Sequence, residues 1–134
     1  MGNRAVITTK NKDIGVYLHW NGGYDSVSAF LKYCELRGFR CPENDNYGWA
    51  RMCQVIANYF GEDGLSIGID RFECLEHSAD YDNGVYVIEN WKIVGRKQFD
   101  GDEQMLHDFK SMLHAINDAQ VKEHRLPKEV IDNL

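Results

Sequence analysis

Apolar and polar residues form two short β-type patterns near the start of the chain. Residues 4–9 (RAVITT) and 14–20 (IGVYLHW) are rich in β-branched and aromatic side chains, as strands are. Between them, residues 10–13 (KNKD) have the composition of a turn. The pattern predicts an N-terminal β-hairpin.

The next two segments have apolar residues at the spacing of an amphipathic helix. The first is expected from about residue 25 to residue 37, with Asp25 or Ser26 as its N-cap and Gly38 as its stop. The second is expected over residues 47–60, after an asparagine cap.

The last helix has the clearest pattern of the three. We expect Asp100 or Asp102 to cap it, because aspartate accepts hydrogen bonds from the free amides of a first turn. The apolar positions that fit the i, i+3, i+4, i+7 spacing are Met105, Leu106, Phe109, Met112, Leu113 and Ile116.

Strand patterns return in the middle of the chain. Residues 65–70 (LSIGID) predict one strand, and residues 84–97 (GVYVIENWKIVGRK) predict a hairpin that turns at Glu89-Asn90. The intervening residues 71–83 are irregular and acidic.

The resulting order, β-β-α-α-β-β-β-α, favours an α+β fold with a mainly antiparallel sheet and three helices. A parallel nucleotide-binding sheet is the alternative. We expect a single domain over residues 1–126, followed by a loose C-terminal tail over residues 127–134.

Composition restricts the class of protein. The chain has 134 residues, of which 43% are hydrophobic, which suits one packed domain. It has neither an apolar run of the ~20 residues that cross a bilayer nor a secretory signal pattern. We therefore expect a cytoplasmic protein with no membrane partner, located in the host cytoplasm if a phage encodes it.

The formal net charge is −6, and no Lys/Arg cluster is present. This balance argues against direct nucleic-acid binding. It suits a protein that covers a basic surface on a partner.

The four cysteines do not predict a metal centre. Cys74 and His77 have C-x-x-H spacing, which is half of a zinc site, and no second pair follows. In a cytosolic setting the thiols are expected to be reduced. We predict no metal and no cofactor.

The segment HWNGGYDS, residues 19–26, is the main candidate site. Two glycines between a strand and a helix allow another group to approach closely, and the free amides of a first helical turn favour an anion. An Asn-Gly-Gly segment is also an ordinary way to end a strand, so a purely structural turn is the bland alternative. The candidate ligand-binding residues here are His19, Asn21, Gly22, Gly23, Tyr24, Asp25 and Ser26.

A second candidate group opens the second helix. Trp49 and Arg51 follow Tyr47 and would suit base stacking and phosphate contact, provided that both helices begin at one cleft. Alternatively, Trp49 belongs to the core. His19 beside Asp25 would provide an acid/base pair, although a histidine on a strand is also commonly structural.

Residues 21–26, NGGYDS, resemble the PP-loop of ATP pyrophosphatases, whose signature is SGG-x-DS. Asn21 replaces the leading serine, and the repeated β-α units of that family do not follow. The resemblance implies that Gly22, Gly23, Asp25 and Ser26 would touch the pyrophosphate of ATP.

Two longer segments, GVYLHWNGGYDSVSAFLKYCELRG and YGWARMCQVIANYFG, resemble a group of small uncharacterised bacterial proteins associated with prophages and mobile elements. The resemblance spans roughly residues 4–99. It implies a setting in which small proteins neutralise host machinery.

Three functions remain open on these grounds. The first is a non-catalytic counter-defence inhibitor of a host immune effector, such as a CRISPR nuclease. The second is a sponge that sequesters a nucleotide immune signal at the turn from Asn21 to Ser26. The third is a small nucleotide- or phosphate-processing enzyme that uses His19 and Asp25. The partner is thus a host defence protein or an anionic nucleotide, and the oligomeric state stays open.

Overall fold

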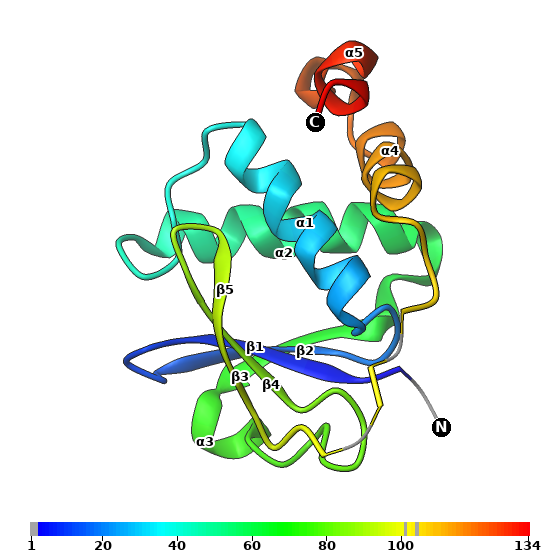
Figure 1. Ribbon diagram of the computed structural model, residues 1–134. Coiled ribbons are helices and arrows are strands. Elements are labelled where there is room, and N and C mark those ends of the chain that lie inside the picture. Colours follow the sequence, from blue (N-terminus) through cyan, green and yellow to red (C-terminus); the bar gives the residue numbers. More distant parts are fainter. Residues whose placement is uncertain (1–2, 101, 104) are drawn as a thin grey trace.

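A five-stranded sheet forms the base of the fold, and most of the helices cover one of its faces (Figure 1). The structure is a computed structural model that describes residues 3–100, 102–103 and 105–134. The strand order is β3-β2-β1-β4-β5. The strands are β1 (Ala5–Thr9), β2 (Ile14–Leu18), β3 (Ile67–Arg71), β4 (Val85–Glu89) and β5 (Lys92–Lys97).

The sheet is mixed. Three strand pairings are antiparallel, whereas β1 and β4 pair in parallel, with Val6 opposite Val85. The expected α+β class, the N-terminal hairpin and the hairpin within residues 84–97 are confirmed. The parallel pairing at the centre of the sheet lies outside the expectation, because it joins segments about 80 residues apart.

The expectation of three helices is corrected, because the described residues contain five α-helices. They are α1 (Tyr24–Leu36), α2 (Asn46–Phe60), α3 (Phe72–Leu75), α4 (Phe109–Ala119) and α5 (Lys128–Asp132). The same described residues contain two 3₁₀ helices, of which Gly61–Ser66 joins α2 to β3 and Lys122–His124 lies between α4 and α5. Within the described chain, no helix is both long enough and apolar enough to cross a membrane.

Both faces of the sheet are buried near its centre. Ala5 and Ile7 of β1 point into the main core beneath α1 and α2, whereas Val6 packs against Phe72 of α3 on the opposite face. A strand covered on both sides does not need to alternate apolar and polar residues. This explains the uniformly apolar start of β1.

The β4–β5 turn is fixed by a buried tryptophan. Asn90 and Trp91 both have positive φ, of 53° and 60°, which is the conformation of a type I′ turn. The Trp91 side chain is buried, and its indole Nε1 donates a hydrogen bond to the Phe39 carbonyl at 2.8 Å. The turn lies one residue later than the sequence indicated, because this packing selects its position.

The last major helix begins later than expected. It starts at Phe109, where the Asp108 carboxylate caps it by accepting a hydrogen bond from the Ser111 amide at 3.1 Å. A start at Asp100 or Asp102 was expected, but residues 102–103 and 105–108 are not helical, so this expectation is wrong. Residues 101 and 104 lie outside the described part of the chain. We refer to residues 105–108 as the strap.

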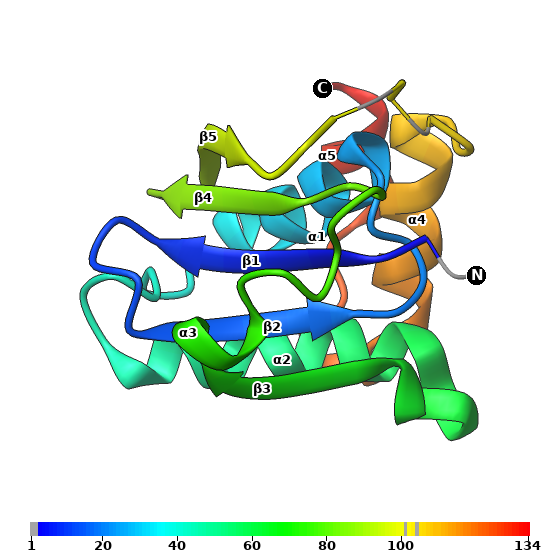
Figure 2. The same ribbon diagram turned by 90° about the horizontal axis from the view of Figure 1, so that it is seen from below.

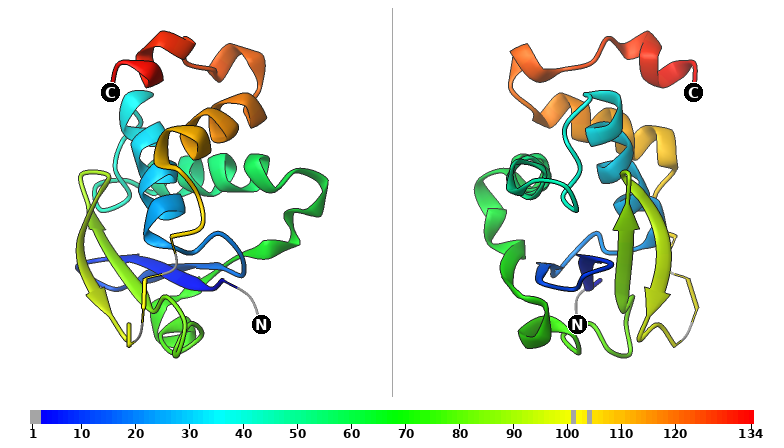
Figure 3. Two further views of the ribbon diagram at one scale, coloured as in Figure 1. Left: turned by 45° about the vertical axis from the view of Figure 1, so that its right-hand side comes forward. Right: turned by 90° about the vertical axis from the view of Figure 1, so that its left-hand side faces the viewer.

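Residues 127–134, expected to form a loose tail, contain α5. Figure 3 shows that α5 and the chain leading to it lie beyond α1 and α4, on the side away from the sheet. The Ile131 side chain is fully buried, and His114 on α4 lies 2.8 Å from the Asp132 carboxylate. The sequence shows too few apolar residues here to reveal the element.

The buried Ile131 provides a test of this packing. Ile131→Ala should lower the free energy of unfolding by about 2–5 kcal/mol, because it leaves a cavity. The neighbouring Val130 is 37% exposed, so Val130→Ala should cost only about 0.5 kcal/mol. Urea denaturation of both variants measures the difference, and equal effects would contradict the docking of α5.

Candidate functional site

The Asn-Gly-Gly turn forms a tightly packed corner between β2 and α1. The Gly22 amide donates to the Asn3 carbonyl at 2.8 Å, and the Gly22 carbonyl accepts from the Tyr86 hydroxyl at 2.7 Å. A Cβ at this position would lie 2.6 Å from the Asn3 carbonyl oxygen and 2.8 Å from Ala5 Cβ. Glycine is required here because Asn3, Arg4 and Ala5 pack directly against it.

Asp25 connects the first turn of α1 to the strap. Its side chain is 3% exposed. One carboxylate oxygen accepts from the Ser26 amide at 2.8 Å, and the other accepts from the His107 amide at 2.6 Å. Gly23 occupies the N-cap position, and no side chain caps the helix there. Asp25, expected as a cap or a ligand contact, is therefore a bridge within the protein.

Asn21 adds a second connection to the strap. Its Nδ2 lies 3.2 Å from His107 Nε2. Asn21 has a φ of 58°, and asparagine enters this left-handed region more readily than most residues. Two of the candidate anion contacts, the amides of Gly22 and Ser26, are hydrogen-bonded to Asn3 and Asp25 within the protein.

His19 and Asp25 have separate partners. The His19 Nδ1 lies 2.8 Å from the Tyr17 hydroxyl, and its ring packs edge-on against Trp20. Ser26 is fully buried. A proton transfer between His19 and Asp25 has no support in these contacts.

Trp49 and Arg51 lie apart from the corner. The start of α2 adjoins the β1–β2 turn, where Trp49 and Asp13 line one polar cleft. The start of α1 follows the other end of β2, so the two helices begin at opposite ends of the sheet (Figure 2). Trp49 is 6% exposed within the core, and the Arg51 guanidinium stacks on the Tyr47 ring at 4.9 Å.

Four large apolar side chains are exposed on the segments that form the corner and the strap. Each belongs to a residue within two positions of Asn21, Asp25 or His107, which join the corner to the strap. We call these four the corner patch: Trp20, 47% exposed; Tyr24, 41%; Met105, 57%; and Leu106, 69%. Because exposed aromatic and aliphatic groups of this size are enriched in binding surfaces, the corner patch is suited to a macromolecular contact.

Sequence reasoning missed the two strap residues of the corner patch. Met105 and Leu106 fit the helical period, which predicts a buried helix face for both. Asp108 followed by Ser111 is the signal that could have placed the helix start correctly, because an aspartate cap bonds the amide three positions on.

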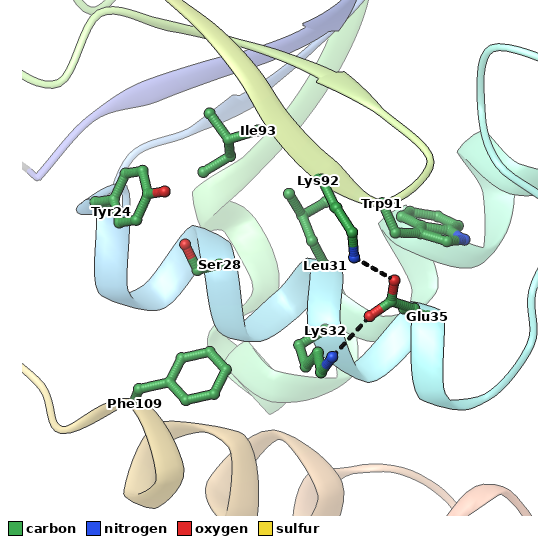
Figure 4. A pocket seen from close by; sticks show the side chains of 9 residues that line it. All are labelled: Tyr24, Ser28, Leu31, Lys32, Glu35, Trp91, Lys92, Ile93 and Phe109. Atoms are coloured by element: carbon green, nitrogen blue, oxygen red, sulfur yellow. Dashed lines mark hydrogen bonds and ion pairs between the residues drawn. The ribbon is translucent and has the colours of Figure 1, made fainter. Parts of the chain in front are cut away.

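The corner patch adjoins a groove of about 480 Å³ through Tyr24 (Figure 4). In this view α1 crosses the groove, with the β4–β5 hairpin on one side and the start of α4 on the other. Leu31, Ile93 and Phe109 contribute its apolar surface. We call it the α1–β5 groove.

One end of the groove carries a three-membered ion network. Glu35 accepts from Lys32 at 2.8 Å and from Lys92 at 2.6 Å. Hydrogen bonds from Lys32 and then Lys92 hold the pKa of Glu35 below its usual range. Two lysines therefore share one carboxylate, which leaves this end with a net positive charge.

The described residues offer no metal centre. No group of three or more His, Cys, Asp or Glu residues among them has the geometry of a metal site. His77, expected as half of a C-x-x-H pair with Cys74, lies 2.9 Å from the Asp80 carboxylate.

The corner predicts a strong dependence on Gly22. Gly22→Ala should lower the free energy of unfolding by about 1–3 kcal/mol, because the new methyl group would overlap backbone atoms. Gly68→Ala is the matched control, since its Cβ would meet only Tyr17 Cβ at 3.9 Å and should cost about 0.5 kcal/mol or less. Equal unfolding midpoints in guanidinium chloride would contradict the packing of the corner.

No protein-family model, curated protein or solved structure matches this chain.

Proposed function

We propose that the protein is a small non-catalytic inhibitor that binds a host immune effector, such as a CRISPR nuclease, by direct contact. The observation that carries the binding role is the corner patch. The counter-defence setting rests on the sequence resemblance to prophage and mobile-element proteins. The two parts are tested separately below.

The corner patch has the composition of an interface anchor. Trp20 and Tyr24 belong to the residue types that dominate binding energy at interfaces, because each buries a large rigid surface. Met105 and Leu106 add flexible apolar groups beside them. Exposing such residues together weakens solubility, and a partner that covers them offers a reason for their exposure.

The corner is also preorganised. Asp25 holds the strap against α1 through the His107 amide, and Asn21 adds a side-chain contact. A surface that is already ordered loses less conformational entropy on binding. The hydrogen bonds that order the corner therefore favour contact with a protein.

The charge of the chain supports the same partner class. A net charge of −6 draws the protein toward a basic surface and raises the rate of encounter. Effectors that hold nucleic acid carry such surfaces.

The contacts favour this function over the nucleotide sponge and the enzyme. The Gly22 and Ser26 amides are occupied, and Trp49 and Arg51 lie at the opposite end of the sheet. His19 and Asp25 each have another partner.

The proposal is tested with target-DNA cleavage by purified CRISPR nucleases of the host. The wild-type protein should form a complex with one of them and slow cleavage. Leu106→Asp should weaken inhibition by about tenfold or more, because it places a charge in the contact. Nucleotide and cyclic-dinucleotide titrations run in parallel.

Val121→Asp is the control, since Val121 is 48% exposed and lies outside the corner patch. It should inhibit like the wild type. Unaltered cleavage with every nuclease would contradict the immune-effector role. Full inhibition by Leu106→Asp would contradict the corner patch as the contact, and nucleotide binding or turnover would favour the alternatives.

A further inference from the structure

We propose that the α1–β5 groove binds an extended acidic segment of a partner protein, which pairs through its backbone with the free edge of β5. The inference rests on the proposed function in one respect only, namely that the partner is a protein. It adds a second contact, which uses strand pairing and lysine charge as well as apolar groups.

The first support is the position of β5. It is the last strand in the order β3-β2-β1-β4-β5, and it pairs only with β4. The backbone groups on its other side therefore face no strand in the part of the chain that the structure describes. Such an edge is a template for an added strand.

The second support is the surface beside that edge. Ile93 on β5, Leu31 on α1 and Phe109 on α4 line the groove together (Figure 4). Alternate side chains of an added strand would point toward these apolar groups, since successive residues of a strand face opposite sides. The groove thus suits a segment with an apolar residue at every second position.

The third support is charge. Three of the six residues of β5 are basic, in a chain whose net charge is −6; Arg96 is already paired with Glu103, which leaves Lys92 and Lys97 for a partner. Lys92 is 64% exposed at its side chain, and it shares Glu35 with Lys32. Carboxylates on the added strand would bond these lysines more fully than Glu35 alone can.

A basic residue also stands at the far end of β5. Lys97 is the last residue of this strand, and its proximity lowers the pKa of Lys12 below its usual range. Basic groups therefore occur at both ends of the strand, and this charge selects an acidic partner segment over a basic one.

The edge, the apolar surface and the charge together specify the occupant. Pairing with β5 requires an extended backbone, the groove requires apolar side chains on one face, and the lysines require aspartate or glutamate. A free nucleotide would satisfy only the charge. Tyr24 lines the groove and belongs to the corner patch, so one partner can engage both surfaces.

The test uses a fluorescein-labelled peptide in which isoleucine and valine alternate with aspartate and glutamate. Fluorescence anisotropy with the full-length protein should show saturable binding. A peptide with lysine in place of every acid should not bind, and one with a central proline should bind poorly, because proline removes a strand hydrogen bond.

Lys92→Glu should weaken the acidic peptide about tenfold, whereas Lys122→Glu, on the 3₁₀ turn after α4, should have no effect. Circular dichroism checks that both variants fold. Absence of saturable binding, equal binding of the lysine peptide, or full binding by Lys92→Glu would overturn the inference. Competition by ATP at equimolar concentration would also overturn it, in favour of a small anion.

Leu106→Asp separates this inference from the proposed function. It should leave peptide binding unchanged, because Leu106 does not line the groove. Loss of nuclease inhibition with intact peptide binding would support the groove and the corner patch as separate contacts. Peptide binding without inhibition of any nuclease would leave the groove supported and the immune-effector role contradicted.

Discussion

The carboxylate of Asp25 is the interaction on which the rest of this surface depends. It is 3% exposed, and its two oxygens accept from the amide of the adjacent Ser26 and from the amide of His107, which is 82 residues further along the chain. Burying a carboxylate is costly unless it is hydrogen-bonded. Hydrogen bonds to charged groups contribute about 1.5–3 kcal/mol each, and losing one partner from a buried carboxylate costs more. This constraint holds the strap against α1, keeps residues 105–107 out of the helix, and exposes the corner patch.

The start of a helix can bind an anion or can be packed within the protein, and the contacts of Asp25 favour the second use. An open first turn presents unpaired amides to an anion. Here Gly22 donates to Asn3, and the Ser26 amide donates to Asp25. Trp20, Tyr24, Met105 and Leu106 provide exposed apolar groups around the corner, beside the exposed His107. Tyr24 joins this surface to the α1–β5 groove, where lysines lie beside the apolar groups.

Much of the local structure could be predicted from the sequence, and the errors have physical causes. The helices α1 and α2 and the two hairpins follow from spacing and turn residues, which are local signals. The expected N-caps are wrong, because Gly23 precedes α1 and the Asp45 carboxylate, not Asn46, caps α2. Met105 and Leu106 were misplaced because a helical period extends across a cap without interruption, and the Asp25–His107 bond that prevents the helix is not local.

The short α5 has one fully buried apolar residue, Ile131, too few to create a pattern. The candidate turn was located correctly, but its atoms find their partners in Asn3, Tyr86 and His107, which no local pattern indicates.

Amide hydrogen exchange at His107 tests the central claim most directly. If Asp25 holds the strap, the His107 amide exchanges much more slowly than in a free peptide, although it lies in an exposed, non-helical segment. Asp25→Ala removes that protection, whereas Asp118→Ala, an exposed acid on α4, leaves it unchanged. A His107 amide that exchanges in the wild-type protein at the rate of a free peptide would show that the strap is not held, and would contradict the account.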